Sequence, residues 1–141
     1  MKTILIALVA SIGIFGRTTN TEISGTDNFN FTSNTMNFEL TIPMDLKNKL
    51  VINETENSVV FNYDNPGYPN DVFLFSINKV SEKTWMQLHE NIYNGIVLTN
   101  NDGFITYSET TKENTLRGKN RDEFEQMLGN IHEIVKTYKQ I

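Results

Sequence analysis

From residue 36 onward, apolar and polar residues alternate in short segments. Met36, Phe38, Leu40 and Ile42 are apolar and are separated by polar residues at 37, 39 and 41, which is the period of two expected of a half-buried strand. Further strand-like segments follow at 50–54, 59–63, 72–77, 96–99 and 104–109. The segment 72–77 is almost continuously apolar, which predicts a central strand covered on both faces.

Two other segments have helical spacing. Trp85 and Ile92 lie on one helical face that follows Ser81, a suitable N-cap. The C-terminal segment carries an apolar stripe formed by Phe124, Met127, Leu128, Ile131, Ile134, Val135 and Tyr138, and Asn120 or Asp122 would cap that helix. The pattern therefore predicts an α+β fold, a mostly antiparallel sheet of about six strands packed with two helices, the longer one C-terminal.

The N-terminal segment has the layout of a secretory signal peptide. Lys2 precedes an apolar run of roughly a dozen residues, shorter than the about 20 that a spanning helix needs, and the chain turns polar at Arg17. We expect a signal peptide over 1–17, a flexible linker over 18–33 and a single α+β domain over 34–141. This predicts a secreted or cell-envelope protein, with membrane contact only through an uncleaved signal segment.

Composition narrows the chemistry. The 141 residues include no cysteine, which excludes thiol catalysis and thiolate metal sites. Without Lys2 and Arg17 the chain keeps 10 basic against 17 acidic residues, a net charge of −7, which argues against nucleic-acid binding. His89 and His132 are the only histidines and lack metal-ligand spacing. With no Gly-x-Ser-x-Gly motif, the sequence predicts no metal and no cofactor, and it favours a non-enzymatic protein.

The segment 64–71 supplies most of the candidate binding residues. It is dense in turn-forming residues, and a plain turn is its favoured interpretation. Asp64 and Asp71 bear the oxygen ligands that Ca²⁺ prefers. Tyr68 stands between a glycine and a proline, where a large aromatic side chain has little to pack against, so it is a candidate for partner recognition. Tyr63, on the preceding strand, is a further candidate.

Several core patterns stand out along the predicted domain. They are Phe38-x-Leu40-x-Ile42-Pro43, Phe73-x-Phe75-x-Ile77, a helix that is entered through Ser81 and carries Trp85, and a long C-terminal helix ending at Tyr138-Lys139. In these patterns the chain resembles small secreted or lipoprotein α/β domains of low-GC Gram-positive bacteria, some of which are similar to the sandwich of PsbP-type extrinsic photosystem proteins. The resemblance carries no catalytic residues. Ile14-Phe15-Gly16-Arg17 also resembles a lipoprotein signal in which Arg17 replaces the lipidated cysteine, which predicts release rather than lipid anchoring.

Three functional hypotheses follow. The leading one is a non-enzymatic extracytoplasmic module that binds a protein or envelope component through loops or a sheet face. The first alternative is a small-ligand carrier or enzyme, with a pocket between the sheet and the C-terminal helix where Tyr63, Tyr107 and His132 converge. The second is a calcium-stabilised envelope domain.

Overall fold

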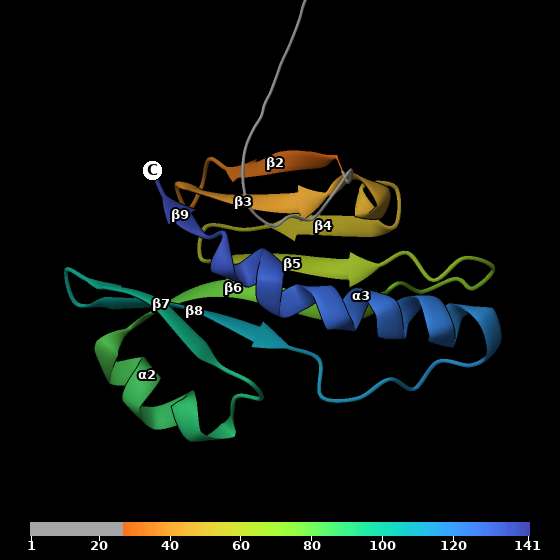
Figure 1. Ribbon diagram of the computed structural model, residues 1–141. Helices are drawn as coiled ribbons and strands as arrows, with labels where there is room; N and C mark the ends of the chain where they lie inside the picture. The colour runs from red at the N-terminus through yellow and green to blue at the C-terminus, as the bar shows by residue number, and fades with distance from the viewer. Residues whose placement is uncertain (1–26) are drawn as a thin grey trace, which may run out of the picture.

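The computed structural model describes residues 27–141, which form two antiparallel sheets and two α-helices (Figure 1). The first sheet has the order β2-β3-β9 and comprises β2 (Asn28–Ser33), β3 (Phe38–Pro43) and β9 (Lys139–Gln140). The second has the order β4-β5-β6-β8-β7 and comprises β4 (Leu50–Glu54), β5 (Ser58–Tyr63), β6 (Val72–Ser81), β7 (Ile96–Asn101) and β8 (Phe104–Thr110). The helices are α2 (Glu82–Leu88) and α3 (Gly118–Lys136), with short 3₁₀ turns η2 (Met44–Leu46) and η3 (His89–Asn91).

The fold class is confirmed, and the sheet is corrected. The structure is α+β, every strand pairing is antiparallel, and the longer helix is C-terminal. The single sheet of about six strands is wrong, because residues 27–141 form eight strands in a three-stranded and a five-stranded sheet. Strand β6 is central in the larger sheet, as predicted, and its residues 74–77 are buried in succession.

The predicted linker over 18–33 is wrong for its last residues. Residues 28–33 form β2, which pairs with β3 so that Phe31 lies opposite Leu40. The Phe31 ring packs edge-on against Phe61, with 5.3 Å between centroids. Phe29 also packs against the core. The segment is mostly polar, but Phe29 and Phe31 lie on one face of the strand and pack against the core. Their burial makes the strand part of the fold. The predicted signal peptide over 1–17 and linker residues 18–26 lie outside the described residues.

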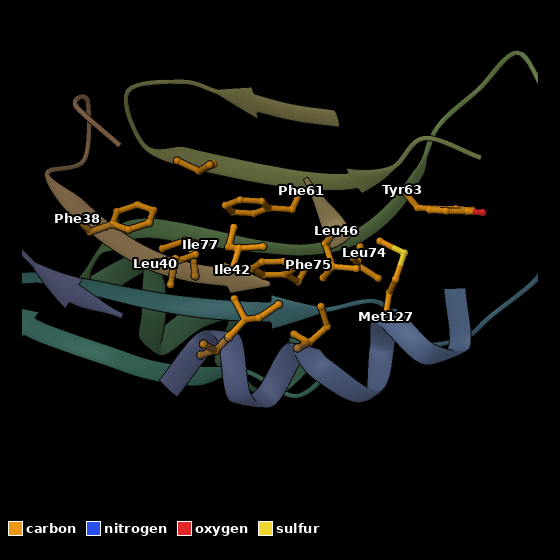
Figure 2. Packing of buried hydrophobic residues seen from close by; sticks show 14 of the residues in the cluster. Phe38, Leu40, Ile42, Leu46, Phe61, Tyr63, Leu74, Phe75, Ile77 and Met127 are labelled. Carbon is orange, nitrogen blue, oxygen red and sulfur yellow. The ribbon is translucent and has the colours of Figure 1, made fainter. Parts of the chain in front are cut away.

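The core lies between one face of the five-stranded sheet, the three-stranded sheet and α3. Phe61 on β5 and Phe75 on β6 stack with 4.3 Å between centroids, and Figure 2 shows these rings directed toward β3 and α3. Helix α3 contributes Phe124, Met127, Ile131, Ile134 and Val135. Each fully buried side chain of this size stabilises the fold by about 1.5–3 kcal/mol, so the predicted stripe is what fixes α3 on the sheet.

Helix α2 packs on the opposite face of the same sheet. Ser81 caps it, as predicted, by accepting a hydrogen bond from the Thr84 backbone N–H at 3.1 Å. Trp85 packs against Tyr107 of β8 with 4.9 Å between ring centroids. Tyr107 points away from the α3 face because strand side chains alternate. Trp85 is therefore a packing residue.

The cap predicted for α3 is wrong. The helix begins at Gly118 after Arg117, which makes no side-chain cap hydrogen bond. The Asn120 side-chain amide instead donates to Asn65 Oδ1 and to the Pro66 carbonyl, each at 2.9 Å. This amide ties the start of α3 to the loop between β5 and β6. Within residues 27–141, no helix has the length and apolarity needed to span a membrane.

Candidate functional site

Tyr68 lies where the sequence placed it, exposed in the loop between β5 and β6. Its side chain is 64% exposed, and its backbone N–H donates to the Asn65 carbonyl at 3.2 Å. Together with Leu116 and Asn120 it borders a shallow hollow of about 220 Å³. Its predicted role in binding stays a prediction.

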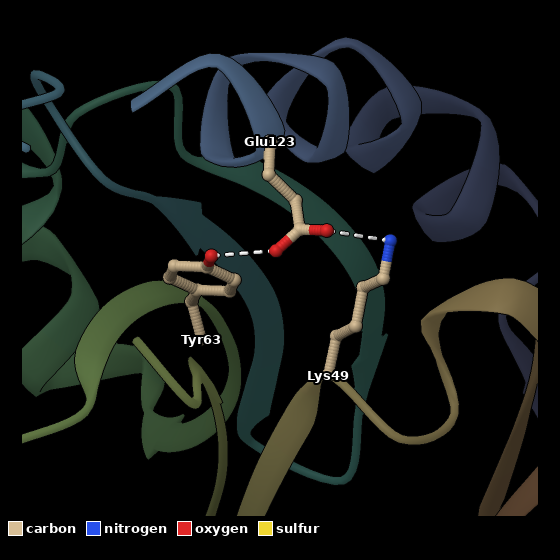
Figure 3. A network of polar contacts seen from close by, with 3 residues as sticks. All are labelled: Lys49, Tyr63 and Glu123. Atoms are coloured by element: carbon tan, nitrogen blue, oxygen red, sulfur yellow. Dashed lines mark hydrogen bonds and ion pairs between the residues drawn. The ribbon is translucent and has the colours of Figure 1, made fainter. Parts of the chain in front are cut away.

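Tyr63, by contrast, is fully buried. It forms a polar network with Glu123 and Lys49, which we call the clamp (Figure 3). Its hydroxyl donates to Glu123 Oε1 at 2.6 Å, and Glu123 Oε2 pairs with Lys49 Nζ at 2.8 Å. Burial, and then the Glu123 carboxylate, raise the pKa of Tyr63. Hydrogen bonds from Lys49 and Tyr63 hold the pKa of Glu123 below its usual value. The clamp joins the start of α3 to β5 and to the residue before β4, and it leaves Tyr63 no exposed surface for recognition.

The two predicted loop carboxylates do not form a metal centre. Asp64 is exposed, and Asp71 Oδ2 accepts a hydrogen bond from the Asn62 amide at 2.7 Å. Across residues 27–141, no group of three or more His, Asp or Glu side chains is arranged to hold a metal ion. The calcium alternative therefore gains no support from the geometry of this loop.

The pocket expected between Tyr63, Tyr107 and His132 does not form. Tyr63 is engaged at the start of α3, Tyr107 packs against Trp85 on the other face of the sheet, and His132 is exposed on α3. Phe75 and its core neighbours fill the space between β6 and α3. The prediction failed because it ignored the alternation of strand side chains, which sends Tyr107 away from the helix.

A different hollow opens at the edge of the larger sheet, between β7–β8 and α3. It has a volume of about 370 Å³, and its lining includes Ile96, Ser108, Leu128, Ile131, His132 and Val135. We call it the α3–β7 groove. A second hollow of about 250 Å³ shares Ile96, His132 and Val135 with it and extends toward Lys136 and Tyr138. The groove lies between the sheet and the C-terminal helix, but it is displaced from the filled core toward the edge strand.

Strand β7 borders this groove as an open edge. It lies at the end of the five-stranded sheet, and no strand within residues 27–141 pairs with its outer side. Ile96 is 39% and Val97 47% exposed. The strand contains no charged residue and no proline, two of the devices with which proteins protect a sheet edge. Its one irregularity is a register shift between Val97 and Thr99.

The other edge of the same sheet is β4, which ends in a charged residue. Strand β4 ends at Glu54, whose carboxylate accepts hydrogen bonds from the hydroxyls of Ser33 and Thr35. These bonds lower the pKa of Glu54 and join the end of β4 to the β2–β3 connection. Of the two edges, β7 is the one that combines an uncharged strand with a neighbouring groove.

Ser108 is the buried polar group of the groove. It is 1% exposed, and its hydroxyl is the only buried side-chain polar atom in the described part of the chain without a hydrogen-bond partner. Leaving such a group unpaired costs about 1–3 kcal/mol. Sequence reasoning missed Ser108, although a signal was present. Thr106, Ser108 and Thr110 alternate along β8, so the strand presents a polar row on the face that turns toward α3.

The sequence predicts the hairpin that carries the site, because Asp102-Gly103 is a strong turn signal between the strand-like segments 96–99 and 104–109, and the structure confirms it. Asp102 and Gly103 join β7 to β8, and their φ angles of 54° and 81° are positive, as the two-residue turns favoured in hairpins require.

No protein-family model, no curated protein and no solved structure matches this chain.

Proposed function

We propose that this protein is a non-catalytic binding module that takes up an extended segment of a partner polypeptide as an added strand along β7. The observation that carries the proposal is the open, uncharged edge of β7 beside the α3–β7 groove. Strand addition uses main-chain hydrogen bonds for affinity and pockets for alternate side chains for specificity. The open edge of β7 would supply the hydrogen bonds, and the α3–β7 groove would receive a side chain.

The energetics are consistent with moderate affinity. Each main-chain hydrogen bond formed with β7 contributes roughly 0.5–1.5 kcal/mol net. Ile96, 39% exposed, and Val97, 47% exposed, would lose apolar surface to the added strand. Ordering the partner segment opposes these gains. We expect a dissociation constant on the order of micromolar, which corresponds to about −8 kcal/mol.

The residues around the groove support binding rather than catalysis. Ser108 and His132 bring a hydroxyl and an imidazole to it, but no carboxylate is among the residues that line either hollow. A serine nucleophile of the triad type needs a base that is oriented by a third group. The predicted signal segment would place the module outside the cytoplasm, so we propose a secreted or cell-envelope protein as the partner.

A displayed peptide library supplies the test. Peptides selected on the protein should bind it with micromolar affinity and slow the hydrogen exchange of β7 amides. Val97→Lys, which places a charge on the open edge, should weaken binding at least tenfold. Asn53→Lys, at an exposed position on β4, is the matched control and should leave binding unchanged. Selection of no peptide, or full binding by Val97→Lys, would refute the proposal.

A further inference from the structure

The unpaired hydroxyl of Ser108 points to a ligand that would pair with it. Ser108 lies on β8 between Ile77 of β6 and Ile96 of β7 in the sheet register. It is 1% exposed, lines the α3–β7 groove, and finds no hydrogen-bond partner among residues 27–141. Buried polar groups in folded proteins are nearly always paired, so we expect a bound molecule to supply the missing hydrogen-bond partner of this hydroxyl.

The walls around Ser108 restrict the chemistry of that molecule. Leu128, Ile131 and Val135 from α3 face Ile96 from β7, and the hollow of about 370 Å³ falls within the range of ligand sites. No arginine, lysine or carboxylate lines it, and the polar lining residues besides Ser108 are Thr110 and the exposed Asn94 and His132. Lys136, which lines only the adjoining hollow, pairs with Glu133. A charged group would therefore be desolvated beside Ser108 without a counter-ion, which favours an uncharged ligand.

We infer that the α3–β7 groove binds an apolar aromatic group that ends in a hydroxyl, a ligand of the phenol class, with Ser108 Oγ as its hydrogen-bond partner. A plain aromatic or aliphatic group would fill the walls but leave Ser108 unpaired. A serine or threonine side chain would be too short to fill the space. The inference rests on the proposed function, since it identifies a tyrosine of the added strand as the side chain that enters the groove.

The test uses two soluble probes that differ by one hydroxyl, N-acetyl-tyrosinamide and N-acetyl-phenylalaninamide. Both are too short to add a strand, so they examine the groove alone. In ¹H–¹⁵N NMR titrations of the protein, the tyrosine probe should shift the amides of Ser108 and of residues 128–135. It should bind about tenfold more tightly than the phenylalanine probe, because a site built to pair a hydroxyl discriminates against the analogue that lacks it.

Ser108→Ala should reduce that preference to less than about threefold. Ser76→Ala is the control, since Ser76 is a buried serine of the same sheet whose hydroxyl already accepts from the Asn78 amide at 2.8 Å, and it should keep the preference. Equal affinity for the two probes, absence of binding, or a preference that survives Ser108→Ala would overturn the inference. Library peptides that lose binding in Val97→Lys would still support strand addition in that case, so the two failures are distinguishable.

Discussion

Removal of the Glu123 carboxylate should destabilise the protein by about 2 kcal/mol, and most of that loss should come from Tyr63. The Tyr63 hydroxyl is fully buried and donates to Glu123 at 2.6 Å, so Glu123→Ala leaves a buried donor unpaired, at a cost of about 1–3 kcal/mol. The ion pair with Lys49 adds little, because the two side chains are 37% and 24% exposed and such pairs contribute about 0–1 kcal/mol.

A double-mutant cycle separates these contributions. Tyr63→Phe removes the donor and should cost less, about 1 kcal/mol, because Glu123 keeps Lys49 and some solvent contact. The double variant should be more stable than the sum of the single losses predicts, by about 1 kcal/mol, since it contains no unpaired hydroxyl.

Urea unfolding, followed through the fluorescence of the single tryptophan, Trp85, is the assay. With a slope of about 2 kcal/mol per molar, Glu123→Ala should lower the midpoint by about 1 M. Glu123→Gln, which keeps an oxygen that can accept from Tyr63, should lower it by less than half as much. An unchanged midpoint for Glu123→Ala, or losses that simply add in the double variant, would refute the assignment of the clamp as a buried, hydrogen-bonded contact.

Three further predictions concern the rest of the fold. The pKa values of Glu54 and Glu123 are lowered by hydrogen bonds, so the stability they contribute is present above the unfolded pKa of about 4.3. It is lost as the pH falls through their folded values, and urea midpoints should decrease below about pH 5 and less steeply in Glu123→Gln. Phe31→Ala should cost about 2 kcal/mol in urea unfolding, whereas a residue in a linker would leave the midpoint unchanged. Gly103→Ala should cost about 1–2 kcal/mol through backbone strain alone, because its φ is +81° whereas no neighbouring atom lies within 4 Å of the added Cβ. Gly129→Ala in α3 has equally open surroundings and should instead stabilise the protein by up to about 1 kcal/mol. Changes of the same sign for both variants would contradict this explanation.

Local signals in the sequence predicted the elements whose geometry depends on a few neighbouring residues. Asp102-Gly103 specified the β7–β8 hairpin because its two residues adopt positive φ angles. Ser81 specified the start of α2 because its acceptor lies three residues from the donor, at Thr84. Strand β2 was missed because its stability depends on β3 and on Phe61, a residue distant in sequence. A polar segment with two phenylalanines becomes a strand only where such partners exist.

The candidate site depends even more on contacts between residues that are far apart in the sequence. Tyr63 and Glu123 are 60 residues apart, so no local pattern distinguishes a buried clamp from an exposed aromatic. The groove lies beside the packed core, to which α3 contributes Phe124, Met127 and Ile131, and it opens at the edge strand β7. What the sequence did contain was the polar row of β8, which runs against the rule that a core-facing strand side is apolar.

Two unusual features of the fold, the edge strand without charge or proline and the buried serine without a hydrogen-bond partner, both lie at the α3–β7 groove. An edge strand without charge or proline has a simple explanation by itself, since the register shift at Val97 and Thr99 already hinders regular pairing between copies. A buried serine without a partner also has one, as a small cost that a stable core tolerates. Neither explanation accounts for their position, because Ile96 of the open edge and Ser108 lie opposite each other in the sheet and line the same hollow. Sequences tend to break such rules at functional sites. The proposed strand would account for both features at once, because it would pair the edge and bring a side chain to the unpaired hydroxyl.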